Sequence, residues 1–255
     1  AWWPKAGAFI DYLGRCSYLL QQGLFVGDIC YYYGDQAYNF VPPKHHDPSL
    51  GPGYDYDVAN AEVILTRMAV ADGRIVLPDG MSYALLVLPD RPDMDLDVLR
   101  KLEKLVQAGA TIVGPKPIRS NGLGGFRARD ASVKRLADKL WGPCNGTSVT
   151  EHRYGRGQVI WGRSLGRIFK AQGIGPDFQV HAAEEAKLDF IHRQVGDSQI
   201  YFVSNQTPQW VQADCEFRVR GRVPELWLPE SGEIRPQAVY RDTPQGTVVP
   251  LRLPP

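Results

Sequence analysis

Apolar residues near the start of the chain recur at the spacing of a helix. Four of them follow one another at intervals of four, three and four positions: Phe9, Leu13, Cys16 and Leu20. Residues spaced in this way lie on one face of an α-helix, and a glycine commonly terminates such a helix. We therefore expect an amphipathic helix between Ala6 and Gln22 that ends at Gly23.

Short apolar strands then alternate with amphipathic helices as far as residue 175. Strands are expected at residues 25–33, 83–88, 110–113 and 158–161. Helices are expected after the capping residues Asp57, Asp95 and Asp130 and at residues 164–172. Asp72-Gly73 and Asp79-Gly80 flank a short predicted hairpin. Alternation of this kind indicates βαβ units, so the expected fold class is α/β, with a mostly parallel sheet and flanking helices.

The pattern changes after Gly175-Pro176. Strand-like segments follow one another with only turns between them, at residues 178–180, 187–194, 199–205, 211–219, 225–228 and 248–253. Gly196-Asp197 lies between two of these segments and is a typical hairpin turn. We expect a separate, small antiparallel β-sandwich here.

Composition excludes two classes of partner. The 255 residues carry 29 Lys and Arg against 28 Asp and Glu, so no overall field would attract a nucleic acid or an acidic membrane surface. The longest apolar runs, such as residues 84–88, are far shorter than the roughly 20 residues of a membrane span. We therefore expect no nucleic acid and no membrane as partner. The four cysteines lack C-x-x-C spacing, so no zinc site, disulfide framework or other cofactor is indicated in this chain.

One cysteine lies in a pattern that resembles a catalytic motif. The segment Gly142-Pro143-Cys144-Asn145-Gly146 has the spacing of a nucleophile elbow. An elbow follows a strand and opens a helix, whereas here a helix comes first and the polar residues 147–156 afterwards are turn-like. The context favours a loop that ends the helix. A thiol amidotransferase-like enzyme that uses Cys144 or Cys30 is kept as an alternative.

Two groups of side chains are candidates for contact with a substrate. A polar loop after the first strand of the sheet carries His45, His46, Asp55 and Asp57, and open α/β sheets bind ligands beyond the ends of their strands. These residues lack the spacing of a metal site, and the alternative is an exposed loop with both aspartates in turn or cap positions. Trp2 and Trp3 can stack on sugar rings or be buried at an interface.

Short motifs spread over nearly the whole chain are shared with a known family. They are Trp2-Trp3, Asp11–Cys16, Tyr18–Gly23, Tyr31–Gly34, Pro52–Asp57, Leu77–Tyr83, Gly109–Pro117, His192-Arg193, Tyr201–Asn205, Leu226-Trp227 and Ser231–Ile234. On these motifs the chain resembles glycoside hydrolase family 106, the α-L-rhamnosidases.

The resemblance implies an order of parts. In the family, a catalytic (β/α)₈ barrel is followed by an α/β domain similar to class I glutamine amidotransferases and then by β-sandwich modules. Residues 1–23 would be the closing helix of the barrel, residues 24–175 the flavodoxin-like or class I amidotransferase-like domain, and residues 176–255 a β-sandwich or part of one. Because the chain begins without Met or a targeting signal, we expect a piece of a longer polypeptide.

The resemblance also implies where catalysis takes place. The family is regarded as inverting and calcium-assisted, with acid and base glutamates on the barrel, and those positions would precede Ala1. The implied partners are that barrel and, through it, a rhamnose-containing carbohydrate, and calcium would belong to the catalytic domain. Family members are bacterial and often exported, which implies a periplasmic or extracellular setting.

The residues themselves agree with a non-catalytic interpretation. Inverting hydrolysis requires two carboxyl groups roughly 6.5–9.5 Å apart. The adjacent Glu184 and Glu185 point to different sides of a strand or helix, and no other pair is indicated. We expect a portion that supports the catalytic barrel. The alternatives are an independent carbohydrate-binding or oligomerisation module and the thiol enzyme described above.

Overall fold

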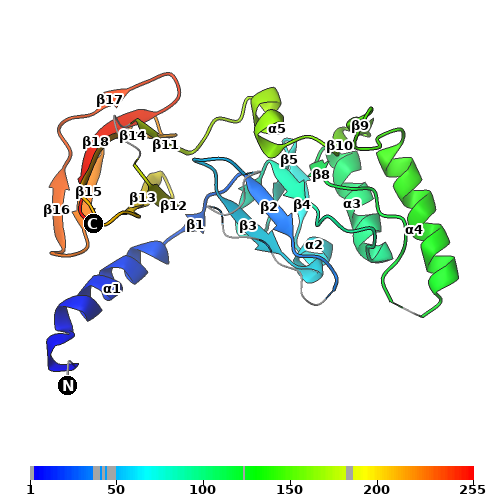
Figure 1. The fold of residues 1–255 in the computed structure, drawn as a ribbon, viewed down its shortest axis with the longest axis horizontal. Helices are drawn as coiled ribbons and strands as arrows, with labels where there is room; N and C mark the ends of the chain where they lie inside the picture. Colours follow the sequence, from blue (N-terminus) through cyan, green and yellow to red (C-terminus); the bar gives the residue numbers. More distant parts are fainter. Residues whose placement is uncertain (1–2, 37–40, 42–43, 45–49, 123, 182–185) are drawn as a thin grey trace. The chain divides into compact units, whose positions relative to one another are not determined.

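The computed structural model describes residues 3–36, 41, 44, 50–122, 124–181 and 186–255. The chain divides into two compact units (Figure 1). We call Gly27–Ile174 the α/β unit, and Ala1–Val26 together with Gly175–Pro255 the β unit. Within the described ranges, no helix combines the length and the apolar character needed to cross a bilayer.

A six-stranded sheet forms the centre of the α/β unit. From edge to edge its strands are β3 (Tyr56–Ala59), β2 (Ile29–Tyr32), β7 (Leu85–Val87), β8 (Thr111–Val113), β10 (Gly157–Ile160) and β9 (Glu151–Tyr154). Every neighbouring pair is parallel except β9 with β10. In chain order the parallel strands are arranged 2-1-3-4-5, which is the order of flavodoxin-like doubly wound sheets. The prediction of a mostly parallel sheet is confirmed.

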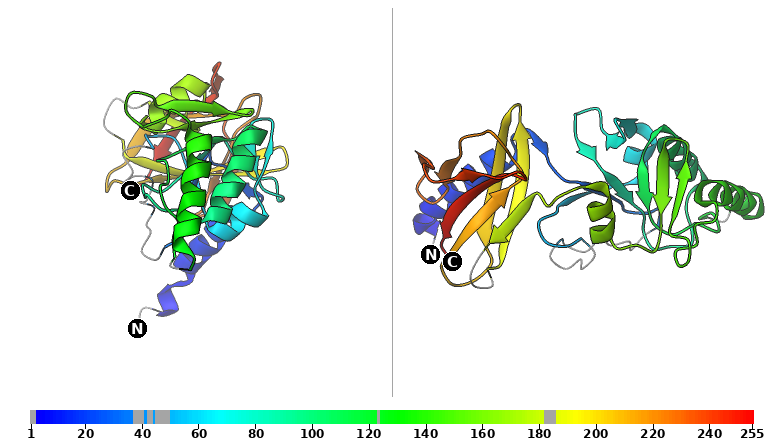
Figure 2. Two further views of the ribbon diagram at one scale, coloured as in Figure 1. Left: turned by 90° about the vertical axis from the view of Figure 1, so that its right-hand side faces the viewer. Right: turned by 90° about the horizontal axis from the view of Figure 1, so that it is seen from above.

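Helices cover both faces of this sheet. Successive side chains of a strand point to opposite faces, so neighbouring residues of one strand pack against different helix layers. Cys30 and Tyr32 face the layer of α2 (Ala61–Thr66), α3 (Leu96–Ala108) and α4 (Phe126–Trp141). Ile29 faces the opposite layer, which contains α5 (Leu165–Gln172). Figure 2 shows α3 and α4 side by side on one face. The apolar sides of both helix layers are buried against the strands.

Some elements differ from the sequence prediction. Asp57 lies within β3 and does not cap a helix, because Asn60 takes that role by accepting the backbone N–H of Val63 at 3.0 Å. The helix α4 begins at Phe126, before Asp130, whose carboxylate accepts the N–H of Ser120 at 2.8 Å. The polar segment expected as a turn contains β9, and a charged strand is a common way to end a sheet.

A small three-stranded sheet completes the α/β unit. It consists of β4 (Ala69–Ala71), β5 (Arg74–Val76) and β6 (Ser82–Tyr83). The two residues between β4 and β5 are Asp72 and Gly73, with φ angles of 50° and 77°. Positive φ at both central positions is the geometry of a tight hairpin turn, which is why Asp-Gly is favoured there. The hairpin predicted from this dipeptide is confirmed.

Two antiparallel sheets form the β unit. One contains β1 (Leu24–Phe25), β12 (Leu188–Val195) and β13 (Ser198–Asn205); the other contains β11 (Phe178–His181), β14 (Val211–Phe217), β18 (Thr247–Leu253) and β17 (Arg241–Asp242). Side chains from both sheets share one core, in which Phe178 and Phe190 lie with ring centroids 5.1 Å apart. A separate hairpin is formed by β15 (Glu225–Leu228) and β16 (Glu233–Pro236).

The first helix, α1 (Gly7–Leu20), belongs to the β unit, and the short 3₁₀ turn η1 (Trp3–Lys5) precedes it. The guanidinium of Arg15 donates a hydrogen bond of 2.8 Å to the carbonyl of Pro229, between β15 and β16. No residue of α1 is buried, and Phe9, Ile10 and Leu13 are 59%, 48% and 41% exposed. These three residues form an apolar stripe at the surface of the β unit. The expected role of α1 as the closing helix of a barrel stays a prediction.

Candidate functional site

Doubly wound sheets bind ligands where the strand order reverses, beyond the carboxyl ends of the strands. In the α/β unit this switch point lies between β2 and β7. Asp35 and Gln36 follow β2, and Arg91, Asp93 and Asp95 follow β7. We call these five residues the switch-point cluster. It occupies the position where this fold would hold a substrate or cofactor.

Asp35 and Asp95 join the two chain segments. The hydroxyl of Tyr32, at the end of β2, donates to Asp35, and burial together with this carboxylate raises the pKa of Tyr32 far above its ordinary range. Asp35 Oδ2 also accepts the backbone N–H of Asp95 at 2.8 Å. Asp95 caps α3 by accepting the N–H of Asp97 at 2.7 Å, and it pairs with Arg129 at 2.8 Å. Protein carboxylates therefore occupy the positive end of α3.

The other members of the cluster are also joined to one another. The amide of Gln36 donates to Asp93, and Arg91 donates to the Gln36 carbonyl oxygen at 2.7 Å. Asp93 is 7% exposed, and its Oδ1 lies 3.6 Å from Arg91 Nε, which is too long for a hydrogen bond. Both of these buried atoms lack a hydrogen-bond partner among the described residues. Most of the polar groups at the switch point are thus used by their neighbours.

Among the predicted substrate contacts, Asp55 and Asp57 are described within the α/β unit, and neither belongs to this cluster. Asp55 lies at the amino end of β3, 8% exposed, and forms an ion pair of 2.9 Å with Lys44. Asp57 lies inside β3, where Oδ2 accepts the Tyr83 hydroxyl at 2.7 Å. Trp3 is 68% exposed at the start of the β unit. Trp2, His45 and His46 lie outside the described residues.

The candidate thiols are buried and have raised pKa values. Burial, followed by the nearby Asp57 carboxylate, raises the pKa of Cys30 to about 12. Burial also raises the pKa of Cys144, which is 2% exposed and lies three positions after the end of α4. A nucleophilic cysteine needs a lowered pKa and access to solvent. Neither thiol meets this requirement, in agreement with the interpretation of the segment around Cys144 as a helix-ending loop.

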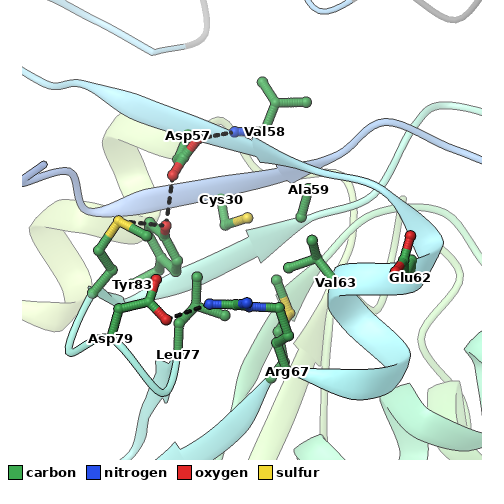
Figure 3. A pocket seen from close by; sticks show the side chains of 12 residues that line it. Cys30, Asp57, Val58, Ala59, Glu62, Val63, Arg67, Leu77, Asp79 and Tyr83 are labelled. Atoms are coloured by element: carbon green, nitrogen blue, oxygen red, sulfur yellow. Dashed lines mark hydrogen bonds and ion pairs between the residues drawn. The ribbon is translucent and has the colours of Figure 1, made fainter.

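A pocket of about 410 Å³ opens beside β3 and α2 (Figure 3). Its apolar wall includes Val63, Leu77 and Met81, and Asp57 and Glu62 are among its polar residues. Arg67 and Asp79 also line it and form an ion pair with each other. A volume of this size is ordinary for a small-molecule pocket. The sequence analysis singled out Asp57 and Cys30 but did not predict the pocket, because its lining comes from three separate segments of the chain, namely Cys30, residues 57–68 and residues 77–83.

No group of three or more His, Cys, Asp or Glu side chains within the described ranges could hold a metal ion. The calcium implied by the family resemblance was expected in the catalytic domain, and that expectation stays a prediction.

A further polar cluster, missed at the level of sequence, lies inside the β unit. Asp177 is 2% exposed and accepts hydrogen bonds from His192 Nδ1 at 2.7 Å and from the Tyr201 hydroxyl at 2.8 Å. The ring of His192 stacks on Tyr201 with centroids 3.9 Å apart. His192 and Tyr201 belong to motifs that the chain shares with the family, but Asp177 belongs to none of them. It lies 15 and 24 positions before these partners, so the sequence alone did not connect the three residues. We call these three residues the Asp177 cluster.

A family model and a solved structure carry the same description. A model of the family described as alpha-L-rhamnosidase matches residues 1–242. A Formosa agariphila protein named "Putative beta-glucuronidase" is 33% identical over 255 residues, which is 99% of this chain and 20% of that protein. The solved structure of a rhamnosidase from Novosphingobium sp. PP1Y is 33% identical with a TM-score of 0.85, over 100% of this chain and 24% of that one.

A more distant structure shares the fold alone. The β-galactosidase from Bacillus circulans sp. alkalophilus is 11% identical with a TM-score of 0.53, over 94% of this chain and 43% of that one. The chain thus spans about a fifth to a quarter of the length of the two more similar relatives.

Proposed function

Because the chain belongs to the alpha-L-rhamnosidases of glycoside hydrolase family 106, we propose that it is a non-catalytic portion of a longer glycosidase that acts on α-L-rhamnosides. The observation that carries the proposal is the pairing within the switch-point cluster, where Asp35, Asp95 and Gln36 already bind protein groups. A site that performs chemistry keeps such groups directed at its substrate. The buried thiols with raised pKa values support the same conclusion.

The proposed role of this portion is to support the catalytic part. The apolar stripe of Phe9, Ile10 and Leu13 supports this role, because contiguous exposed apolar side chains mark interaction surfaces. Full burial of such a side chain contributes roughly 1.5–3 kcal/mol, so even partial burial of three would hold a neighbour firmly. The 2-1-3-4-5 strand order supports the finer proposal that the α/β unit is amidotransferase-like and kept for packing.

The test is hydrolysis of a chromogenic aryl α-L-rhamnoside. We expect no turnover by these 255 residues and clear turnover by a full-length protein that contains them. Circular dichroism of the 255-residue chain provides the control for folding. Turnover by the chain alone that disappears after replacement of one of its own carboxylates would overturn the proposal.

A second candidate function is carbohydrate binding by the β unit. Trp227 and Ile234 face each other across β15 and β16 and are 48% and 54% exposed. The indole N–H of Trp227 donates to Glu225 at 3.3 Å, which orients the ring. An exposed, oriented indole beside a carboxylate suits stacking on a sugar. Calorimetry with rhamnose-containing oligosaccharides tests this function, and equal binding by Trp227→Ala would exclude it.

A further inference from the structure

The pocket beside β3 combines an apolar wall with an excess of negative charge. Among its lining residues, Asp57, Glu62 and Asp79 are acidic and Arg67 is the basic one. Burial raises the pKa of the Cys30 thiol to about 12, and burial followed by the bond to Asp57 raises the pKa of Tyr83 well above its ordinary value. Both groups are therefore neutral at pH 7. The described lining carries a net charge of two negative units.

The pairing inside the pocket leaves two carboxylates without a cation. Arg67 forms its ion pair with Asp79. Asp57 accepts hydrogen bonds from the Tyr83 hydroxyl and from the Val58 N–H, at 2.7 Å each, but neither donor is charged. No ion pair joins Asp57 or Glu62 to a basic side chain in the described part of the chain. Each of these two carboxylates can still accept a cation.

The two carboxylates lie on opposite sides of the pocket. Figure 3 shows Asp57 on one side and Glu62 on the other, with Cys30, Ala59 and Val63 between them. The residues between are small or apolar, and Met81 contributes a flexible thioether that adapts to the shape of a ligand. Tyr83 is 1% exposed, so its ring offers no surface for stacking a sugar. The lining suits a flexible alkyl chain with a positive charge at each end.

We propose that this pocket binds a short aliphatic diamine, with one ammonium group at Asp57, the other at Glu62, and the alkyl chain over Ala59 and Val63. The two positive charges of the ligand match the net charge of the lining, and its alkyl chain matches the small and apolar residues that lie between the carboxylates. Partly exposed ion pairs of this kind are each worth up to about fivefold in affinity. Binding is therefore expected to weaken as salt is added.

The experiment is a titration of the full 255-residue chain with 1,5-diaminopentane, followed by methyl NMR. We expect shifts of the Val63 and Met81 methyl signals, and about tenfold weaker binding of the neutral 1,5-pentanediol. Glu62→Gln and Asp57→Asn are each expected to weaken the diamine about two- to fivefold. Asp90→Asn is the matched control, because Asp90 is exposed and does not line the pocket, and it should change nothing.

Several outcomes would overturn the proposal. Equal affinity for the diol and the diamine would show that charge plays no part. Unchanged binding by the Asp57 and Glu62 variants, or shifts confined to residues elsewhere, would place the ligand outside the pocket. Tighter binding of a lysine-containing peptide than of the diamine would identify a protein segment as the ligand. Glu62 is exposed on α2, so Glu62→Gln stays informative even if Asp57→Asn disturbs the bond to Tyr83.

Discussion

Replacing Asp177 with alanine should destabilise the β unit strongly. The carboxylate is 3% exposed, accepts hydrogen bonds from His192 and Tyr201, and has Arg218 Nε at 3.4 Å. Alanine would leave the buried His192 Nδ1 without this acceptor and would remove an acceptor from the partly buried Tyr201 and Arg218. Truncating one partner of a buried charged pair typically costs about 3–5 kcal/mol of the free energy of unfolding. With a urea dependence of about 2 kcal/mol per M, the unfolding midpoint should fall by about 2 M.

Two further variants make this prediction specific. Tyr201→Phe removes one hydrogen bond to the carboxylate, and such a bond is worth about 1.5–3 kcal/mol, so its effect should be smaller. Because Asp177 and Tyr201 are in contact, the double variant should lose less than the sum of the two single losses. Asp197→Asn removes the same charge from a side chain that is 96% exposed and should have almost no effect.

The assay is urea unfolding followed by near-ultraviolet circular dichroism, with the same spectra confirming that each variant is folded in buffer. The reasoning would be refuted by a loss for Asp177→Ala below about 1 kcal/mol, the net value of an ordinary neutral hydrogen bond. It would also be refuted if Asp177→Ala and Asp197→Asn behaved alike. Either result would mean that the Asp177 cluster is not a buried charged network in solution.

The remaining predictions concern thiol reactivity and pH. Alkylation at neutral pH should label the half-buried Cys16 first, and should label Cys30 and Cys144 only in denaturant. Mass spectrometry of digests identifies the labelled cysteines. Rapid labelling of Cys144 in the folded protein would contradict this prediction. The hydrogen bond from Thr243 and the neighbouring His181 lower the pKa of Glu216 below 4.5. Because this pKa is lower in the folded than in the unfolded state, the ionised carboxylate stabilises the fold, and the free energy of unfolding should fall as the pH drops below about 4.5. The fall should be smaller in Glu216→Gln. Equal dependence of stability on acid pH in the two proteins would contradict this prediction.

Local sequence patterns predicted most of the helices and strands, because caps, apolar spacings and tight turns depend on residues only a few positions apart. The helix expected between Asp95 and Gly109 is observed as α3, since its cap and its apolar spacing act within single turns. The Gly196-Asp197 turn is observed between β12 and β13 for the same reason. The errors concern where two helices begin. Asp57 and Asp130 both resemble helix caps, but Asn60 caps α2, and α4 already begins at Phe126, so that Asp130 lies inside it and accepts the N–H of Ser120.

The candidate sites could not be predicted in the same way. Asp35 and Asp95 are 60 positions apart and meet only because β2 and β7 are neighbours in the sheet. The sequence signal that could have found them is the presence of acidic residues directly after two parallel strands, but this signal requires the strand order. His192 and Tyr201 are register partners across the β12–β13 hairpin, whereas Asp177 lies 15 and 24 positions before them, outside this hairpin. Site geometry of this kind depends on topology.

The α/β unit has the architecture of a ligand-binding sheet but uses its ligand position for internal contacts. At the amino end of α3, Asp35 accepts the Asp95 N–H, and Asp95 accepts the Asp97 N–H and pairs with Arg129. A helix amino terminus that is satisfied by its own chain gains nothing from an anionic ligand. Removing such contacts would cost stability. This arrangement supports the proposal that the α/β unit serves the longer polypeptide through its rigid surfaces.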